Sequence, residues 1–191
     1  MKKSLLIAAI ALVCGTLAYA QPRAIGGRLG AFDGVSYEHA LGENNMIEIE
    51  AGLSIDGRTD YWLRSGGASY HGKYWGRTVQ AAFTYDWIDP FGAKFPWEHK
   101  GEWHWYLGVG AAGGFGWEAY NAYGGASTNW GFAGAAGRAG VEFDFWFPLQ
   151  LSIDFRPTLG ASMFDTLGDG IHTGLYWEMT CFALGVRYRF H

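Results

Sequence analysis

The sequence predicts an all-β protein, a closed antiparallel β-barrel of eight strands that spans a membrane. Three observations lead to this prediction. Polar and apolar residues alternate over most of the chain, the last strand is amphipathic and ends in an aromatic residue, and the chain begins with an export signal. After the signal, no apolar run reaches the roughly 18 residues that a membrane helix needs, so a membrane protein with this sequence has to be a barrel.

Residues 1–20 have the form of a cleaved signal peptide. Two lysines follow the initiator methionine, residues 5–17 form an apolar core too short to cross a bilayer, and small residues end the segment at Ala20. We expect cleavage after Ala20, which leaves residues 21–191 as one domain outside the cytoplasm of a Gram-negative cell. A lipoprotein site at Cys14 is the competing interpretation, and the bulky Val13 in front of it disfavours that site.

The mature chain is acidic, with 12 Lys and Arg against 18 Asp and Glu and a net charge of −6 once the two signal lysines are removed. This balance argues against nucleic acid as a partner, because nucleic-acid binding requires clustered basic charge. Cys181 is then the single cysteine, so no internal disulfide can form. We expect Cys181 to pack on the inner face, because no second thiol is present for redox chemistry.

Six strands follow from strict alternation of large apolar residues on one face with polar or small residues on the other. They cover residues 47–54, 79–87, 103–111, 141–147, 149–156 and 182–190. The stretch 24–41 is either one bent strand or a hairpin that turns at residues 32–34. A closed barrel made from one bacterial chain has an even number of strands, which favours the hairpin and a total of eight.

The intervals between these strands predict four outer loops and shorter periplasmic turns. The loops are residues 32–34, 57–72, 118–129 and 164–172, and the turns are residues 42–45, residues 90–101 and the corner at 147–148. Pro157 falls within a strand of a barrel that has no edge. Because proline has no amide hydrogen for a strand ladder, we expect a β-bulge or a local break at residues 156–158.

The polar face carries small residues between its charges, which indicates that it lines the narrow lumen of an eight-stranded barrel. These small residues are Gly26, Gly30, Ala40, Gly52, Ala82, Gly108, Gly110, Gly114, Ala183 and Gly185. Aromatic residues near the strand ends of the apolar face predict a periplasmic girdle. They are Trp87, Trp103, Trp105, Phe145, Phe147, Tyr188 and Phe190. A secreted lipocalin-like ligand-binding barrel, with the apolar face inward, is the alternative.

Charged residues on the polar face predict a network inside the lumen. They are Arg28, Glu38, Glu48, Glu50, Asp86, Arg138, Glu142, Asp144, Asp154, Arg156, Arg187 and Arg189. Isolated charges in such an interior would be costly, so we expect them to pair and, with Tyr106, to fill the barrel as a salt-bridged plug. A proton or ion path is the other interpretation of the same residues.

Several segments resemble a family of small outer-membrane β-barrel proteins of anaerobic gut and oral Gram-negative bacteria. The matching segments are residues 24–30, 35–39, 154–157 and 186–190. The resemblance implies an outer-membrane location and an eight-stranded barrel, and it supplies neither an activity nor catalytic residues. The chain departs from this pattern at His191, because such barrels usually end on the aromatic residue itself.

No residue pattern predicts a catalytic, metal or cofactor site. His71, His99, His104 and His172 lack metal-ligand spacing. A lipid A-modifying barrel enzyme is a second alternative, and it needs a nucleophile, a base and an orienting acid. The candidates for those roles lie in the predicted outer loops, and they are Asp60, Ser69, His71, Asp165 and His172.

Cations and aromatic residues gather around the second and third predicted loops. Arg58, Arg64, Lys73 and Arg77 would lie where the strands leave the membrane, and guanidinium groups can bind the phosphates of lipopolysaccharide. The aromatic residues form either an outer girdle or a stacking surface, and they are Tyr61, Trp62, Tyr70, Tyr74, Trp75, Tyr120, Tyr123 and Trp130. We therefore expect a monomer whose partners are outer-membrane lipid, lipopolysaccharide and, during biogenesis, the barrel-assembly machinery.

Overall fold

The computed structural model describes residues 22–30, 33–54, 59–65, 68–89, 100–121, 127–166, 170–179 and 181–190. The predicted signal peptide lies outside these residues, as does His191. Side chains are described within these ranges except at positions 22, 54–77, 118–128 and 164–172. The described part of the chain contains no helix that is long and apolar enough to cross a membrane.

The described residues form eleven β-strands, rich in the aromatic residues that fit a pleated surface. The strands are β1 (Pro22–Gly30), β2 (Asp33–Ala40), β3 (Asn45–Ser54), β4 (Thr59–Ser65), β5 (Ala68–Ile88), β6 (Gly101–Asn121), β7 (Ser127–Phe145), β8 (Gln150–Phe155), β9 (Thr158–Thr166), β10 (Gly170–Glu178) and β11 (Phe182–Arg189). All of their pairings are antiparallel and lie in one sheet.

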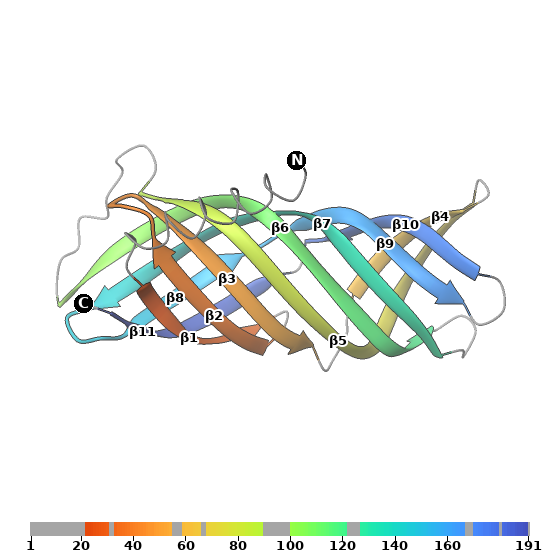
Figure 1. The fold of residues 1–191 in the computed structure, drawn as a ribbon, viewed down its shortest axis with the longest axis horizontal. Helices are drawn as coiled ribbons and strands as arrows, with labels where there is room; N and C mark the ends of the chain where they lie inside the picture. The colour runs from red at the N-terminus through yellow and green to blue at the C-terminus, as the bar shows by residue number, and fades with distance from the viewer. Residues whose placement is uncertain are drawn as a thin grey trace, which may run out of the picture.

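Eight of these strands close into a ring in the order β1, β2, β3, β5, β6, β7, β8 and β11. The pairing of β11 with β1, from Ala24 opposite Arg189 to Gly30 opposite Ala183, closes the ring. Figure 1 shows this ring as one half of an elongated tube. The prediction of a closed antiparallel eight-stranded barrel is therefore confirmed.

Beyond the tip of the β1–β2 hairpin, the described strands form a narrower ring of six. There β4 pairs with β5 on one side and with β10 on the other, and β9 joins β10 to β7. The long strands β5, β6 and β7 run through both rings (Figure 1). β1 and β2 therefore meet part of the way along the wall, at Gly30 and Asp33, whereas the prediction of an outer loop at residues 32–34 placed this point at the far rim.

The predicted outer loops are largely strand. Residues 57–72 contain β4 and the beginning of β5, which pair as a hairpin from Thr59 opposite Tyr74 to Ser65 opposite Ala68. Likewise, β6 extends to Asn121, and β7 begins at Ser127. The prediction of long loops at 57–72 and 118–129 was wrong, because the described residues of these segments pair with neighbouring strands. Their alternation is too irregular to indicate this pairing.

The break predicted at Pro157 is present, because β8 ends at Phe155 and β9 begins at Thr158. Gly137 N still donates to Pro157 O at 2.9 Å, and Arg156 N donates to Cys181 O at 3.1 Å. The register against β7 continues across the break, whereas the register against β11 and β10 is offset by one residue. The strand therefore accommodates the missing amide hydrogen of proline by interrupting the ladder.

The two faces of the barrel have the polarities that the sequence predicts. Large apolar side chains point outward all around the ring, as Val35 (63% exposed), Ile153 (55%) and Phe182 (62%) illustrate. The buried side chains are mainly polar and charged residues that point into the lumen. The core of this protein is therefore polar, and its surface is apolar.

Candidate functional site: the charged lumen

Arg138, on β7, lies at the centre of the lumen and is almost completely buried. Its Nε is 2.8 Å from Glu48 Oε2, and its Nη1 is 2.8 Å from Asp86 Oδ2. Its Nη2 donates to the Tyr106 hydroxyl at 3.0 Å. Residues from β3, β5 and β6 therefore meet on one guanidinium group from β7, which links strands on opposite sides of the ring.

Arg187, on β11, is the second centre of the network. It donates to Glu48 Oε1 at 2.7 Å, to Ser36 Oγ at 2.8 Å and to Ser152 Oγ at 2.6 Å. Glu48 thus uses one carboxylate oxygen for Arg187 and the other for Arg138. Because each charge has several partners, the network offsets part of the cost of removing these groups from water.

Two more arginines lie toward the six-stranded half. Arg28 Nη2 is 2.6 Å from Asp154 Oδ1, and Arg28 also binds Glu50. Arg156 Nη1 is 2.6 Å from Glu50 Oε2. Glu50 therefore joins β1 to the break between β8 and β9, which extends the ionic layer along the lumen.

The network also reaches the end of the barrel where β1 begins and β11 ends. Glu142 and Glu38 bind Arg23, the latter at 2.9 Å, and Asp144 Oδ2 is 3.7 Å from Arg23. Arg189 Nε is 3.4 Å from the same Asp144 oxygen, and its side chain is 31% exposed. The structure therefore brings all twelve predicted lumen charges into one chain of contacts, in which Arg189 lies at the mouth.

Arg23 is the member of this network that the sequence prediction omitted. Strict alternation from Arg28 through Ala24 would place Arg23 on the outer face. The pairing of β1 with β2 shifts between Pro22 and Ala24, and this irregularity turns Arg23 toward the lumen. The signal in the sequence that could have located this shift is the arginine itself, because a charged residue at the start of an apolar strand face is unusual.

An aromatic layer fills the lumen beyond the charges. The Phe132 and Tyr176 rings stack with centroids 4.2 Å apart, and Trp130 stacks on Phe132 at 5.6 Å. The sequence-based prediction grouped Trp130 with the loop aromatics. This placement was wrong, because Trp130 lies on β7 with its side chain buried.

Glycines on neighbouring strands leave the space that lumen side chains such as these rings occupy. A Cβ atom on Gly116 would overlap Trp130, and one on Gly114 would overlap Phe132. In the ionic layer, a Cβ atom on Gly108 would overlap Asp86, and one on Gly140 would overlap Tyr106. Glycines in the barrel wall therefore leave space for lumen side chains, which explains part of the high glycine content.

The remaining predicted sites have the following positions. Cys181 is buried, with Sγ 3.7 Å from the Glu178 carbonyl oxygen, as expected for a packing residue. Within the described ranges, no group of three or more His, Cys, Asp or Glu residues is arranged to hold a metal ion. His104 Nδ1 is 2.7 Å from Asp89 Oδ2 near the mouth of the barrel, where it joins β6 to the end of β5.

Both loop-based hypotheses fall on residues without described side chains. For the lipopolysaccharide contact, Arg58 lies outside the described residues, and Arg64, Lys73 and Arg77 lie on β4 and β5 in the six-stranded part of the wall. For the enzyme, the side chains of the nucleophile, base and acid candidates are also outside the described set. They are Asp60, Ser69, His71, Asp165 and His172.

No family model and no curated protein matches this sequence. Among solved structures, the chain is similar to the crystal structure of a major outer membrane protein from Thermus thermophilus. The TM-score is 0.49 and the sequence identity 13%, over 90% of this chain and 100% of that chain. The barrel fold described above follows from the strand pairing of this chain itself.

Proposed function

We propose that this protein is a small monomeric β-barrel of the outer membrane whose lumen is closed, with a structural role in the envelope or a role as a surface-interaction protein. The observation that carries this proposal is the polarity of the barrel, with charges inside and large apolar side chains outside. Apolar surface left in water costs about 25 cal/mol per Å². A band of such side chains around the whole ring is therefore suited to hydrocarbon.

The orientation follows from the ends of the described chain. Ala24 pairs with Arg189, so the described chain begins and ends at the same end of the barrel. An exported chain reaches the outer membrane from the periplasm, and an even number of crossings returns its end to that side. The end that contains Arg23, Arg189 and the aromatic girdle is therefore the periplasmic end in this proposal.

The same polarity argues against the lipocalin-like alternative. A soluble ligand-binding barrel keeps an apolar cavity inside, whereas the lumen here contains at least five buried arginine and carboxylate contacts at 2.9 Å or less. A closed ring also has no edge strands through which copies could pair, which supports a monomer. No described residue favours the lipid A-modifying enzyme over a barrel without catalytic activity.

The first prediction tests the location. We expect the protein to fractionate with the outer membrane and to migrate faster on a denaturing gel when it is unheated than after boiling, because the closed barrel resists detergent at room temperature. The measurement is a membrane fractionation followed by paired unheated and boiled gel lanes. Recovery as a soluble periplasmic protein would contradict both the location and the membrane role.

The second prediction tests the closed lumen. We expect the purified barrel to show no stable single-channel steps in a planar bilayer, because the ionic layer occupies an eight-stranded interior that has room only for side chains and the aromatic layer occupies the narrower part beyond it. A porin reconstituted in the same bilayer provides the positive control. Reproducible, ion-selective steps from the purified protein would refute the closed lumen and support an ion path.

A further inference from the structure

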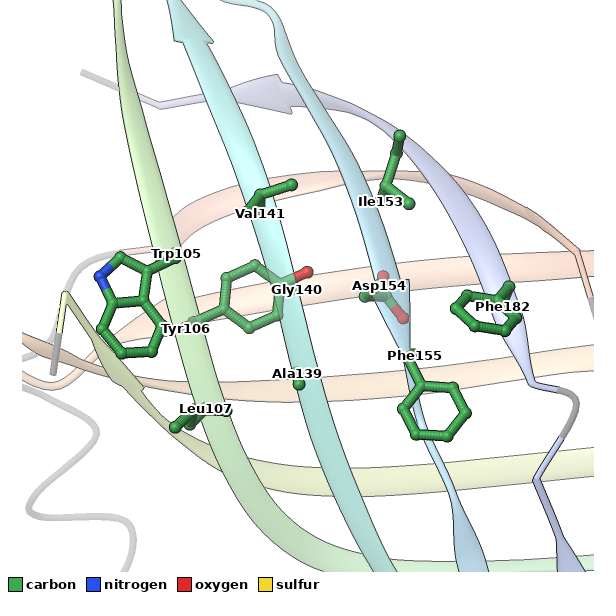
Figure 2. Close-up of a pocket in the computed structure, with 10 residues that line it drawn as sticks. All are labelled: Trp105, Tyr106, Leu107, Ala139, Gly140, Val141, Ile153, Asp154, Phe155 and Phe182. Carbon is green, nitrogen blue, oxygen red and sulfur yellow. The ribbon is translucent and has the colours of Figure 1, made fainter. Parts of the chain in front are cut away.

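Two adjacent hollows lie on the outer, apolar face of the barrel. One has a volume of about 400 Å³ and lies over Ala139 and Gly140 on β7, between Trp105 and Leu107 of β6 and the side chains of β8 and β11 (Figure 2). The other has a volume of about 440 Å³ and lies closer to the periplasmic end. Val141 and Ile153 line both hollows, so together they form one furrow along β7 and β8.

The strand register explains why the wall is hollowed here. Ala139 pairs with Leu107 on one side and with Phe155 on the other, so a methyl group lies between two bulky outward side chains. Phe182 pairs with Phe155, and their ring centroids are 5.0 Å apart. These two rings form the wall of the hollow on the side of β8 and β11. Figure 2 shows the small β7 residues as the floor between these larger side chains.

The floor is thin as well as narrow. Gly140 has no side chain, and the Tyr106 ring lies directly behind it in the lumen, where an added Cβ atom would overlap the hydroxyl group. Gly140 therefore faces the lumen, and the floor of the furrow consists of the β7 backbone and the outward-facing Ala139 and Val141. Because the outward-facing groups that line the furrow are almost entirely hydrocarbon, its occupant has to be apolar.

The length of the furrow matches one leaflet of a membrane. From Phe145 to Ala139 the strand advances six residues, or about 20 Å at roughly 3.3 Å per residue. At a strand tilt of about 40°, this is about 15 Å of height, half of a hydrocarbon core of about 30 Å. One acyl chain of a lipid in the periplasmic leaflet covers the same depth.

The periplasmic end of the furrow has the features of a lipid headgroup region. Trp103, Phe143 and Phe145 line this end, and the rings of Phe143 and Phe145 are 4.6 Å apart. Immediately beyond them, Trp146 N donates to the carbonyl oxygen of Lys100, whose side chain is exposed. A lysine at the membrane interface next to aromatic rings is placed to meet a lipid phosphate.

We infer that this furrow is a binding site for one phospholipid of the periplasmic leaflet. In this site, one acyl chain of the lipid lies over Ala139 and Val141, and the lipid phosphate lies near Lys100. The inference rests on the proposed membrane location. The site would retain this lipid longer than the lipids that surround the rest of the barrel, because its walls contact the acyl chain from three sides.

The test uses full-length protein extracted from outer membranes in a mild detergent, with retained phospholipid counted by native mass spectrometry. Ala139→Leu fills the floor of the furrow and should lower retention roughly tenfold, which corresponds to displacing about two methylene groups from contact. Ala135→Leu is the matched control, because Ala135 lies on the same strand and outer face but does not line the furrow. Lys100→Gln should lower retention to a smaller extent.

Selective loss of one phospholipid in Ala139→Leu, with retention unchanged in Ala135→Leu, would support the site. Equal retention in wild type and both variants would overturn it, as would retention of lipid A in place of phospholipid. An unchanged Lys100→Gln variant would overturn the headgroup contact. The heat-dependent gel shift of each variant shows whether the barrel is folded, and absence of wild-type protein from the membrane fraction would instead refute the proposed function.

Discussion

Replacing Arg187 with methionine is expected to lower the free energy of unfolding by about 3–5 kcal/mol, because it removes one of the two arginines that contact the buried Glu48 carboxylate. Arg187 is 1% exposed and donates to Glu48, Ser36 and Ser152. Methionine keeps much of the length of the side chain, so the change mainly removes charge and hydrogen bonds. The measurement is denaturant unfolding of the barrel in lipid vesicles, followed by tryptophan fluorescence.

Arg189 provides the matched control for this change. It lies two residues further along β11 on the same face, but its side chain is 31% exposed and its nearest carboxylate oxygen, on Asp144, is 3.4 Å away. An exposed ion pair is worth about 1 kcal/mol or less, so Arg189→Met should have a correspondingly small effect. Equal effects of the two substitutions would show that Arg187 is solvated and that the lumen is open to water at that depth.

Alternation along the strands predicted six members of the ring and the direction of its two faces, and the even strand number of a closed barrel supplied the other two. The pattern is informative because residues i and i+2 share a face, so one misplaced residue would reverse a whole strand. Arg138, Glu142 and Asp144 share even positions on β7 and all point into the lumen. The contacts among strands, such as Glu48 between Arg138 and Arg187, depend on the register around the ring and could not be derived from any one strand.

The failures of prediction have two physical causes. Arg23 points inward because the register of β1 shifts at Pro22/Ala24, and a local irregularity of this kind reverses the face of a single residue. β4 was missed because its residues 59–65 do not alternate cleanly between apolar and polar. Its pairing with β10, through Tyr61 opposite Tyr176 and Trp62 opposite Leu175, is a contact between segments more than 100 residues apart.

Trp130 illustrates a different kind of error. The alternation of inward and outward residues was correct for residues 141–147, but it was not followed back toward the start of β7. Trp130 is eight residues before Arg138, so unbroken alternation places both on the inner face. The predicted strand covered only residues 141–147, and Trp130 was therefore grouped with the loop residues. Gly116, which pairs with Trp130 in the register of β6 and β7, supplies the space that makes an indole possible inside a narrow barrel.

Phe132 lies at the centre of the aromatic layer, between Trp130 and Tyr176, and is buried. Phe132→Ala is expected to lower the free energy of unfolding by about 3–5 kcal/mol, because Gly114 beside the ring has no side chain to fill the cavity that it leaves. Phe115→Ala is the control, since Phe115 lies on the neighbouring strand with its side chain facing outward.

Lipid chains can occupy the space that Phe115 vacates, so this control loses the transfer free energy of the ring but gains no cavity. Unfolding in vesicles should therefore show a larger loss for Phe132→Ala than for Phe115→Ala. Equal losses would mean that the aromatic layer packs no better than the lipid-facing surface. The narrowing to six strands would then have to be stabilised by its backbone pairing alone, through β4 and β10.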